Sequence, residues 1–306
     1  MSRNSDLNIH ASPVAEGVRF QVGNATAFAV RKESKDVALR IRREFHPVRD
    51  GMERIPFLRG IVRLVGGAAD FMDGLSESAQ LRPQAIVKGT RFEQRFAELF
   101  RIRSTGMVAA GSAFVILLLM GGLMLFGPWA LVRWVLPRFE LSRAAINVAA
   151  CAARVLAGLL CLVVIPRLRV VNRLCMYRGA INKVLNAPAR KDGRVDRERA
   201  EQVSHLSRRS DAAFCAEVAL LSFIAFAAVR TQTLPVQLLV RALIVLSIAA
   251  VLNEPLRLLE GAEPSLPINI LLALHLWFER LLTRAPHAQM VEVAVYAYNA
   301  ARENDR

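Results

Sequence analysis

Long apolar runs dominate the middle of the chain and predict helices that cross a membrane. Residues 107–132 form the clearest run, with 26 residues and no charged side chain. The hydrocarbon core of a bilayer is about 30 Å thick, and a helix needs about 20 apolar residues to cross it. Runs at 144–165, 212–229 and 236–252 follow, each with one charged residue. The pattern predicts a mainly α, polytopic membrane protein with about four transmembrane helices.

The first 106 residues are more polar and predict a small cytosolic α+β module. Val18–Val22 and Ala27–Arg31 are rich in β-favouring residues and flank the turn dipeptide Gly23-Asn24, which predicts a β-hairpin. A third strand is expected at 36–45. From Pro56, apolar residues recur at three- and four-residue steps, which predicts an amphipathic helix that packs on the hairpin or lies on the membrane surface. These residues are Phe57, Ile61, Leu64, Val65, Ala68, Phe71 and Met72. A further short helix is expected at 91–100.

We therefore expect three regions. Residues 1–106 form the cytosolic module, residues 107–252 form the transmembrane region with a cytosolic loop at 166–211, and residues 253–306 form a cytosolic or interfacial segment. The apolar run at 266–278 is too short to cross a bilayer, so we expect it to lie at the interface.

The charge distribution predicts the orientation. The net charge is +15, with 18 Lys and Arg residues in 1–106 and 12 in 166–211, but three in 133–143 and one in 230–235. Basic loops stay on the cytoplasmic side, so both termini are expected in the cytoplasm of a bacterial cell. Lipid, including anionic headgroups, is the expected partner, together with a membrane protein or a second copy of the chain. Nucleic acid is not expected, because no recognition motif accompanies the charge. No signal peptide is expected at the N-terminus.

The usual catalytic patterns are missing from the sequence. No two of the five histidines are four residues apart, and no phosphate-binding loop, nucleophile elbow or GxGxxG is present. The four cysteines form no CxxC pair, so neither a zinc site nor a disulfide framework is expected. From the residues we predict no catalytic residue, no cofactor and no metal site.

Three charged residues, Arg154, Glu217 and Arg241, lie within the predicted spans. A charge at the centre of a bilayer costs about 2.5–3.5 kcal/mol on insertion scales, so it usually faces protein or water. We predict that Glu217 pairs with Arg154 or Arg241. The pair could be structural, the arginines could extend towards the interface, or the three could line a pathway for a proton or solute.

Small residues at four-residue spacing mark one face of the second span and predict a seam for close helix packing. They are Ala145, Ala149, Ala153, Ala157 and Cys161. Trp134 and Trp277 fall at the depths expected for interfacial anchors.

Several segments, in order along nearly the whole chain, resemble the YqhQ family of bacterial membrane proteins, which is labelled metal-dependent. The matching segments are Glu16–Val18, Phe28–Lys32, Pro56–Gly60, Asn147, Arg154, Glu254, Arg257, Trp277, Thr283, Arg284, Pro286 and Glu292–Ala294.

The segment Tyr177–Lys183 resembles the family pattern Tyr-His-Gly-Ala-Glu-His-Lys. Tyr177, Gly179, Ala180 and Lys183 match, whereas Arg178, Ile181 and Asn182 replace the three ligands that the resemblance implies. Downstream, Ser207 and Ser210 replace a histidine and a cysteine. Such residues do not supply the imidazole, thiolate or carboxylate donors of a metal site.

We therefore expect a non-catalytic membrane protein with a scaffolding, assembly or regulatory role. One alternative is a membrane-associated enzyme that acts at the cytoplasmic face, metal-dependent as the family is labelled. The other is a small transporter.

Overall fold

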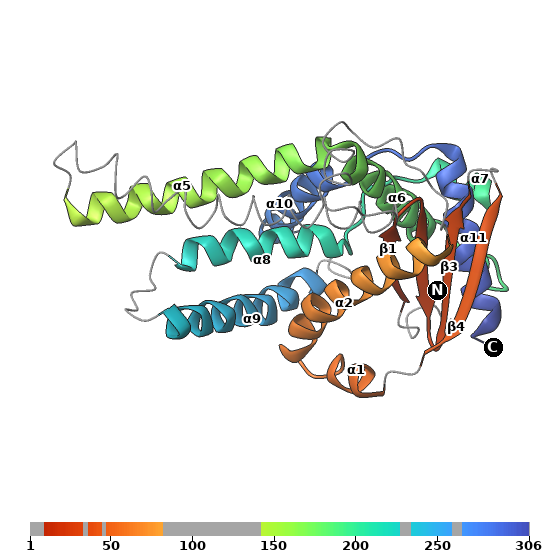
Figure 1. Ribbon diagram of the computed structural model, residues 1–306, viewed down its shortest axis with the longest axis horizontal. Helices are drawn as coiled ribbons and strands as arrows, with labels where there is room; N and C mark the ends of the chain where they lie inside the picture. Colours follow the sequence, from red (N-terminus) through yellow and green to blue (C-terminus); the bar gives the residue numbers. More distant parts are fainter. Residues whose placement is uncertain are drawn as a thin grey trace, which may run out of the picture.

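The computed structural model describes residues 9–32, 36–44, 47–81, 142–226, 234–258 and 265–305. The predicted span at 107–132, the predicted helix at 91–100 and Trp134 lie outside these residues. The described chain is mainly helical and carries an antiparallel sheet near its N-terminus, as the sequence predicted. Figure 1 shows the sheet at one end of the molecule, with α5, α8 and α9 extending towards the other end.

The sheet has four strands in the order β1-β2-β3-β4: β1 (Ile9–Val14), β2 (Gly17–Val22), β3 (Ala25–Arg31) and β4 (Val37–Arg43). The predicted hairpin and third strand are confirmed as β2, β3 and β4. Val22 pairs with Ala25 across the two-residue turn, where Gly23 has a φ of +56° that favours glycine. β1 was not predicted.

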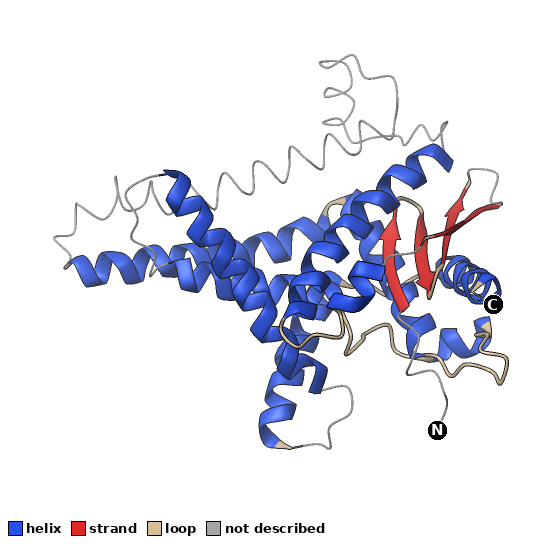
Figure 2. Cartoon of the chain, turned by 90° about the horizontal axis from the view of Figure 1, so that it is seen from below, coloured by secondary structure: helices blue, strands red, loops and turns tan. Residues whose placement is uncertain are grey.

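The two faces of the sheet differ in polarity, because apolar and polar residues alternate along β2. The apolar face packs against α11 (Ala288–Asn304) and α6 (Arg169–Asn186). Phe20 lies edge-on to Tyr298, with the ring centroids 5.6 Å apart. α7 (Arg197–Gln202) adds Ala200 to the same core. Three segments far apart in sequence therefore build one core, with the C-terminal helix beside the N-terminal strands (Figure 2).

α2 (Leu58–Leu81) covers the polar face of the sheet and confirms the predicted amphipathic helix, although it packs with its charged side. The buried Arg19 guanidinium of β2 lies 3.3 Å from the Asp70 carboxylate of α2. The buried Glu77 carboxylate meets Arg40 and lies 2.9 Å from Arg42, both on β4. The short helix α1 (Pro47–Met52) is tied to α2 by ion pairing between Arg49 and Asp70.

The helical bundle consists of α5 (Arg143–Val164), α8 (Asp211–Ala225), α9 (Leu234–Leu258) and α10 (Leu266–Leu282). α8 packs against the other three. A 3-10 turn (Ile165–Arg167) joins α5 to α6, and the chain bends by 85° there. On α5, none of the five seam residues is exposed, whereas Val148, Leu156 and Leu160 are.

Within the described residues, one helix is by itself long and apolar enough to cross a membrane, and it spans Pro235–Arg257. The bent pair of α5 and α6 would be a second candidate if it is counted as one span. Only 11% of the most apolar window of Pro235–Arg257 is buried inside the protein. The core helix of a water-soluble domain would be mostly covered, so this exposure distinguishes α9 from such a helix.

Candidate functional site

A buried polar cluster lies where α6, α8 and α10 meet. Glu217 of α8 and His275 of α10 are almost fully buried, and the His275 Nδ1 atom lies 2.9 Å from a Glu217 carboxylate oxygen. The predicted partners of Glu217 were Arg154 and Arg241, and the structure gives it His275 instead. A buried carboxylate needs a nearby donor, and an imidazole supplies one without bringing a second permanent charge into the bundle.

A second buried carboxylate, Glu279, lies one turn beyond His275 on α10. The Asn182 side-chain amide of α6 donates to a Glu279 oxygen at 2.5 Å and to the His205 carbonyl at 2.9 Å. Asn182 thus joins α10 and the loop before α8 to α6. Burial lowers the pKa of His205 below its usual value and Lys183 lowers it further, while Glu279 acts in the opposite sense.

Four buried atoms of this cluster make no hydrogen bond within the described part of the chain. They are Glu217 Oε2, His275 Nε2, Glu279 Oε2 and Thr283 Oγ1. Carboxylates and imidazoles are the side chains that proteins most often use as general acids and bases, so the cluster is the candidate site of this structure.

Arg154 and Arg241, the other two predicted residues, lie close enough to each other for their charges to repel, and within the described residues neither bonds to Glu217. The Arg241 guanidinium lies over the Phe226 ring, 5.3 Å from its centroid. Within the described residues, neither arginine forms an ion pair with a carboxylate. Asn147 also lies on α5.

Two of the segments that resemble the YqhQ family meet at the start of α2. The Glu254 carboxylate accepts a hydrogen bond from the backbone N–H of Phe57, which has a φ of +65°, and forms an ion pair with Arg59. Gly60 faces α9 so closely that an added Cβ would lie 2.2 Å from the Ala249 carbonyl oxygen. These residues join α2 to α9. Arg257 is exposed at the end of α9.

Another two of these segments meet at α6. A Cβ added to Gly179 would lie 2.2 Å from the Arg284 carbonyl oxygen, so the chain after α10 passes directly over α6. The Lys183 ammonium donates to the Glu201 and Val203 carbonyls at 2.7 and 2.9 Å. Tyr177 is buried in the core under the sheet. Each of these residues makes a contact between elements.

The positions at which the resemblance implies metal ligands do not fit a metal. Ile181 is buried in the core under the sheet, and Arg178 lies within electrostatic range of Asp211. The Ser210 hydroxyl accepts from the Ala213 N–H as the N-cap of α8, and Ser207 accepts from the Arg209 N–H. Within the described residues, no group of three His, Cys, Asp or Glu side chains could hold a metal ion.

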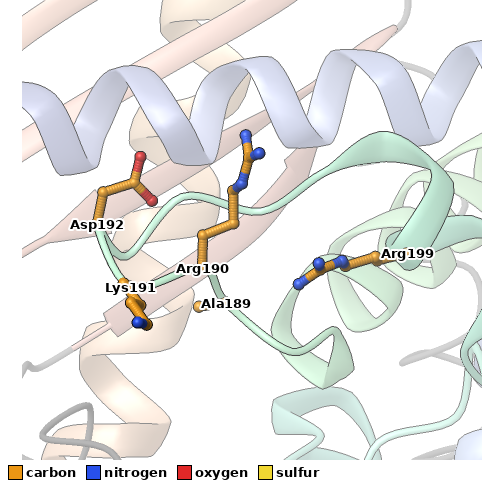
Figure 3. A pocket seen from close by; sticks show the side chains of 5 residues that line it. All are labelled: Ala189, Arg190, Lys191, Asp192 and Arg199. Carbon is orange, nitrogen blue, oxygen red and sulfur yellow. The ribbon is translucent and has the colours of Figure 1, made fainter.

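A shallow surface hollow lies in the loop between α6 and α7, and its side chains are shown in Figure 3. Arg190 and Arg199 both form ion pairs with Asp196, at 3.3 and 3.5 Å. The side chains do not converge on a common point, so we assign no site there.

Comparison with known proteins assigns the chain to a family. A family model described as "Protein of unknown function (DUF1385)" matches residues 55–304. The chain belongs to this family. The DUF1385 match begins just before α2 and includes both pairs of contacting segments. The resemblance predicted from the sequence is confirmed.

A similar protein is the "Uncharacterized protein YqhQ" of Bacillus subtilis (strain 168). It is 24% identical over 294 residues, which cover 94% of this chain and 89% of that protein. No solved structure matches the chain.

His275 and Glu279 were not singled out from the sequence. They lie four residues apart on α10: His275 falls inside the apolar run at 266–278 that was assigned to the membrane interface, and Glu279 comes directly after that run. That i, i+4 spacing of two polar residues on an apolar helix was the available signal.

Proposed function

We propose that this chain is an integral protein of the bacterial cytoplasmic membrane with four spans and both termini in the cytoplasm. One observation carries the proposal: the N-terminal strands, α6 with α7, and α11 pack into a single core. Segments that share a core lie on the same side of a membrane. Two connecting segments join these parts of the core: one runs from β4 to α6 and the other from α7 to α11. Each segment must either cross the membrane an even number of times or stay on the side of the core.

The exposed helices support the first of these options. α8 and α9 lie between α7 and α11 along the chain, and α9 exposes Leu238, Leu239 and Leu243. α5 lies between β4 and α6 together with the charge-free run at 107–132. Two outward and two inward helices account for both excursions.

Reporter fusions test this topology. A periplasm-active reporter inserted at 133–143 or 230–235 is expected to be active, and the same reporter inserted at 187–193 is expected to be inactive. A reporter that is inactive at all three places would contradict the four-span arrangement, and the 187–193 insertion is the internal control.

We further propose that the protein is non-catalytic and acts as a scaffold, an assembly factor or a regulator. The support is that residues matching the family's motifs form contacts between elements: Arg59 with Glu254, Gly179 with the chain at Arg284, and Lys183 with the C-terminal end of α7. The partner would be another membrane protein or a second copy.

Metal analysis of the purified protein tests this role, and crosslinking in intact membranes tests for the partner. We expect no stoichiometric zinc or iron, and a crosslinked product of defined mass. Stoichiometric metal would overturn the non-catalytic role.

One observation favours a second candidate, an enzyme or a proton-coupled transporter. It is the buried Glu217–His275 pair, which could hold a transferable proton within the bundle. Glu217→Gln and His275→Gln keep the side-chain sizes similar and remove the titrating groups. If both variants fold and insert normally but lose proton flux in proteoliposomes, this candidate replaces the first.

A further inference from the structure

α2 buries an unusual number of charged side chains for a surface helix. Beside the buried Val62, Arg59 meets Glu254, Arg63 lies 2.7 Å from Asp211, and Asp70 and Glu77 meet the arginines of the sheet. An amphipathic helix on a soluble protein turns mainly its apolar stripe to the core.

The opposite side of α2 carries a stripe of apolar residues, which we call the outer stripe: Ile61, Val65, Ala68 and Met72. Ile61 is half-buried and Ala68 is exposed. Val65 and Met72 are 55% and 66% exposed, although both are large apolar side chains. Spacings of four, three and four residues place all four on one face of the helix. Phe57, the residue before α2 begins, is also exposed.

The outer stripe begins beside α9, the most exposed apolar helix of the bundle. Gly60 of α2 crosses α9 at Ala249, near the end of α9 that carries Arg257. Leu64 of α2 joins the cluster of Ala249 and Leu256.

α10 meets the same cluster and likewise buries polar side chains while it exposes large apolar ones. Leu272 of α10 packs against the cluster that Leu64 joins. α10 buries His275 and Glu279 but leaves Leu266 and Ile270 80% and 70% exposed. α2, beside the bundle, and α10, within it, therefore both bury charged or polar side chains and expose large apolar ones.

We propose that the outer stripe of α2 lies in the cytoplasmic leaflet of the membrane, in contact with phospholipid acyl chains just below the headgroups. The proposal rests on the membrane insertion of α9 proposed above. Phospholipid fits because the stripe starts next to Gly60, where α2 crosses the exposed apolar helix α9. It also fits because Arg54 and Arg257 are exposed three residues from Phe57 and Glu254, which hydrogen-bond to each other at the start of α2, and could meet lipid phosphates there. The ion pairs of α2 then hold the sheet directly against the membrane surface.

Depth-dependent quenching tests this proposal on the full-length protein in lipid nanodiscs. The four native cysteines are replaced by alanine, and single cysteines are introduced as V65C and M72C for a fluorescent label. L243C, on the exposed side of α9, reports membrane insertion, and K191C, in the exposed loop before α7, reports a position in water. Lipids brominated near the headgroup or deep in the acyl chain, and iodide in water, serve as quenchers.

We expect the labels at V65C and M72C to be quenched best by the shallow bromines and little by iodide, whereas L243C is quenched best by the deep bromines. If V65C and M72C behave like K191C and are quenched by iodide, the stripe faces water and the proposal is overturned. If neither quencher reaches them, protein covers the stripe, and the proposal is again overturned. Failure of lipid quenching at L243C would instead overturn the membrane insertion of α9.

Discussion

Gly60 and Gly67 lie on the same helix, and the space beside each differs completely. A Cβ on Gly60 would meet the Ala249 carbonyl oxygen at 2.2 Å, whereas a Cβ on Gly67 would meet nothing within 4 Å. The backbone of α9 cannot yield as the end of a flexible side chain can. Gly60 thus sets how closely α2 and α9 approach.

We therefore expect Gly60→Ala to destabilise the protein by about 1–3 kcal/mol, because α2 and α9 must move apart. Gly67→Ala is the matched control and should stabilise α2 by about 0.5–1 kcal/mol, because alanine is the better helix former. Thermal unfolding of the purified protein in detergent measures both. Equal effects of the two substitutions would show that the crossing at Ala249 is not tight.

A second prediction at this scale concerns His205. Burial, followed by Lys183, lowers its pKa in the folded protein below the usual value of about 6.5. The folded state then binds fewer protons than the unfolded state, so stability is full above pH 6.5 and falls as the pH drops below it. His205→Gln should therefore lose less stability than the unaltered protein as the pH falls. Thermal unfolding between about pH 7.5 and 5.5 measures this difference. An unchanged profile would assign the loss to other groups.

At the scale of elements, α2 connects the bundle to the sheet. Its ion pairs are less exposed to solvent than those on the open surface. The Arg59–Glu254 pair is largely covered, and Glu254 also accepts from the Phe57 N–H. The Arg194–Glu303 pair, with a separation of 2.8 Å, is half exposed on both sides. Covered pairs with several hydrogen bonds couple more strongly than exposed ones.

Double-mutant cycles to alanine should show this difference. We expect a coupling energy on the order of 1–3 kcal/mol between Arg59 and Glu254. The control pair, Arg194 and Glu303, should couple by less than about 0.5 kcal/mol. Equal coupling in the two cycles would mean that Glu254 does not anchor the start of α2.

The elements that local chemistry specifies were predictable. Gly23-Asn24 between β-favouring runs predicted the hairpin, and apolar spacing predicted α2. β1 was missed because it contains Pro13 and because neither turn residue between β1 and β2 is a glycine. The second of them, Glu16, adopts a φ of +58°, which favours glycine. Pro13 is tolerated because β1 lies at the edge of the sheet.

The orientation of α2 and the partner of Glu217 depend on contacts distant in sequence. The charged face of α2 is buried because Arg19, Arg40 and Arg42 face it from the sheet, and Glu254 and Asp211 face it from the bundle. Glu217 and His275 are 58 positions apart. Periodicity within one segment contains no information about either, which is why these parts of the candidate site could not be predicted.

At the scale of the whole molecule, the two ends of the chain depend on each other. α11 covers the apolar face of β2 and β3, and the Asn24 N–H donates to the Asp305 carboxylate at 3.0 Å. Tyr298 is buried against Phe20, whereas Tyr296, two residues earlier on the same helix, is 49% exposed.

Tyr298→Ala should therefore destabilise the protein by about 3–5 kcal/mol, while Tyr296→Ala should cost less than about 1 kcal/mol. Limited proteolysis should locate the damage, with Tyr298→Ala opening cleavage sites in the N-terminal strands. If those strands stay protected, they fold without α11.

The packing of the first strands against the last helix also sets an order of events during synthesis. Roughly 260 residues separate the end of β3 from the start of α11, and a ribosome that adds 5–20 residues per second needs about 10–50 s to make them. During that delay the helices that we propose to span the membrane can insert, while the apolar face of β2 and β3 lacks the cover of α11. We therefore expect the nascent N-terminal strands to be a chaperone substrate, and a chain that stops before α11 to be recognised by proteases as incomplete.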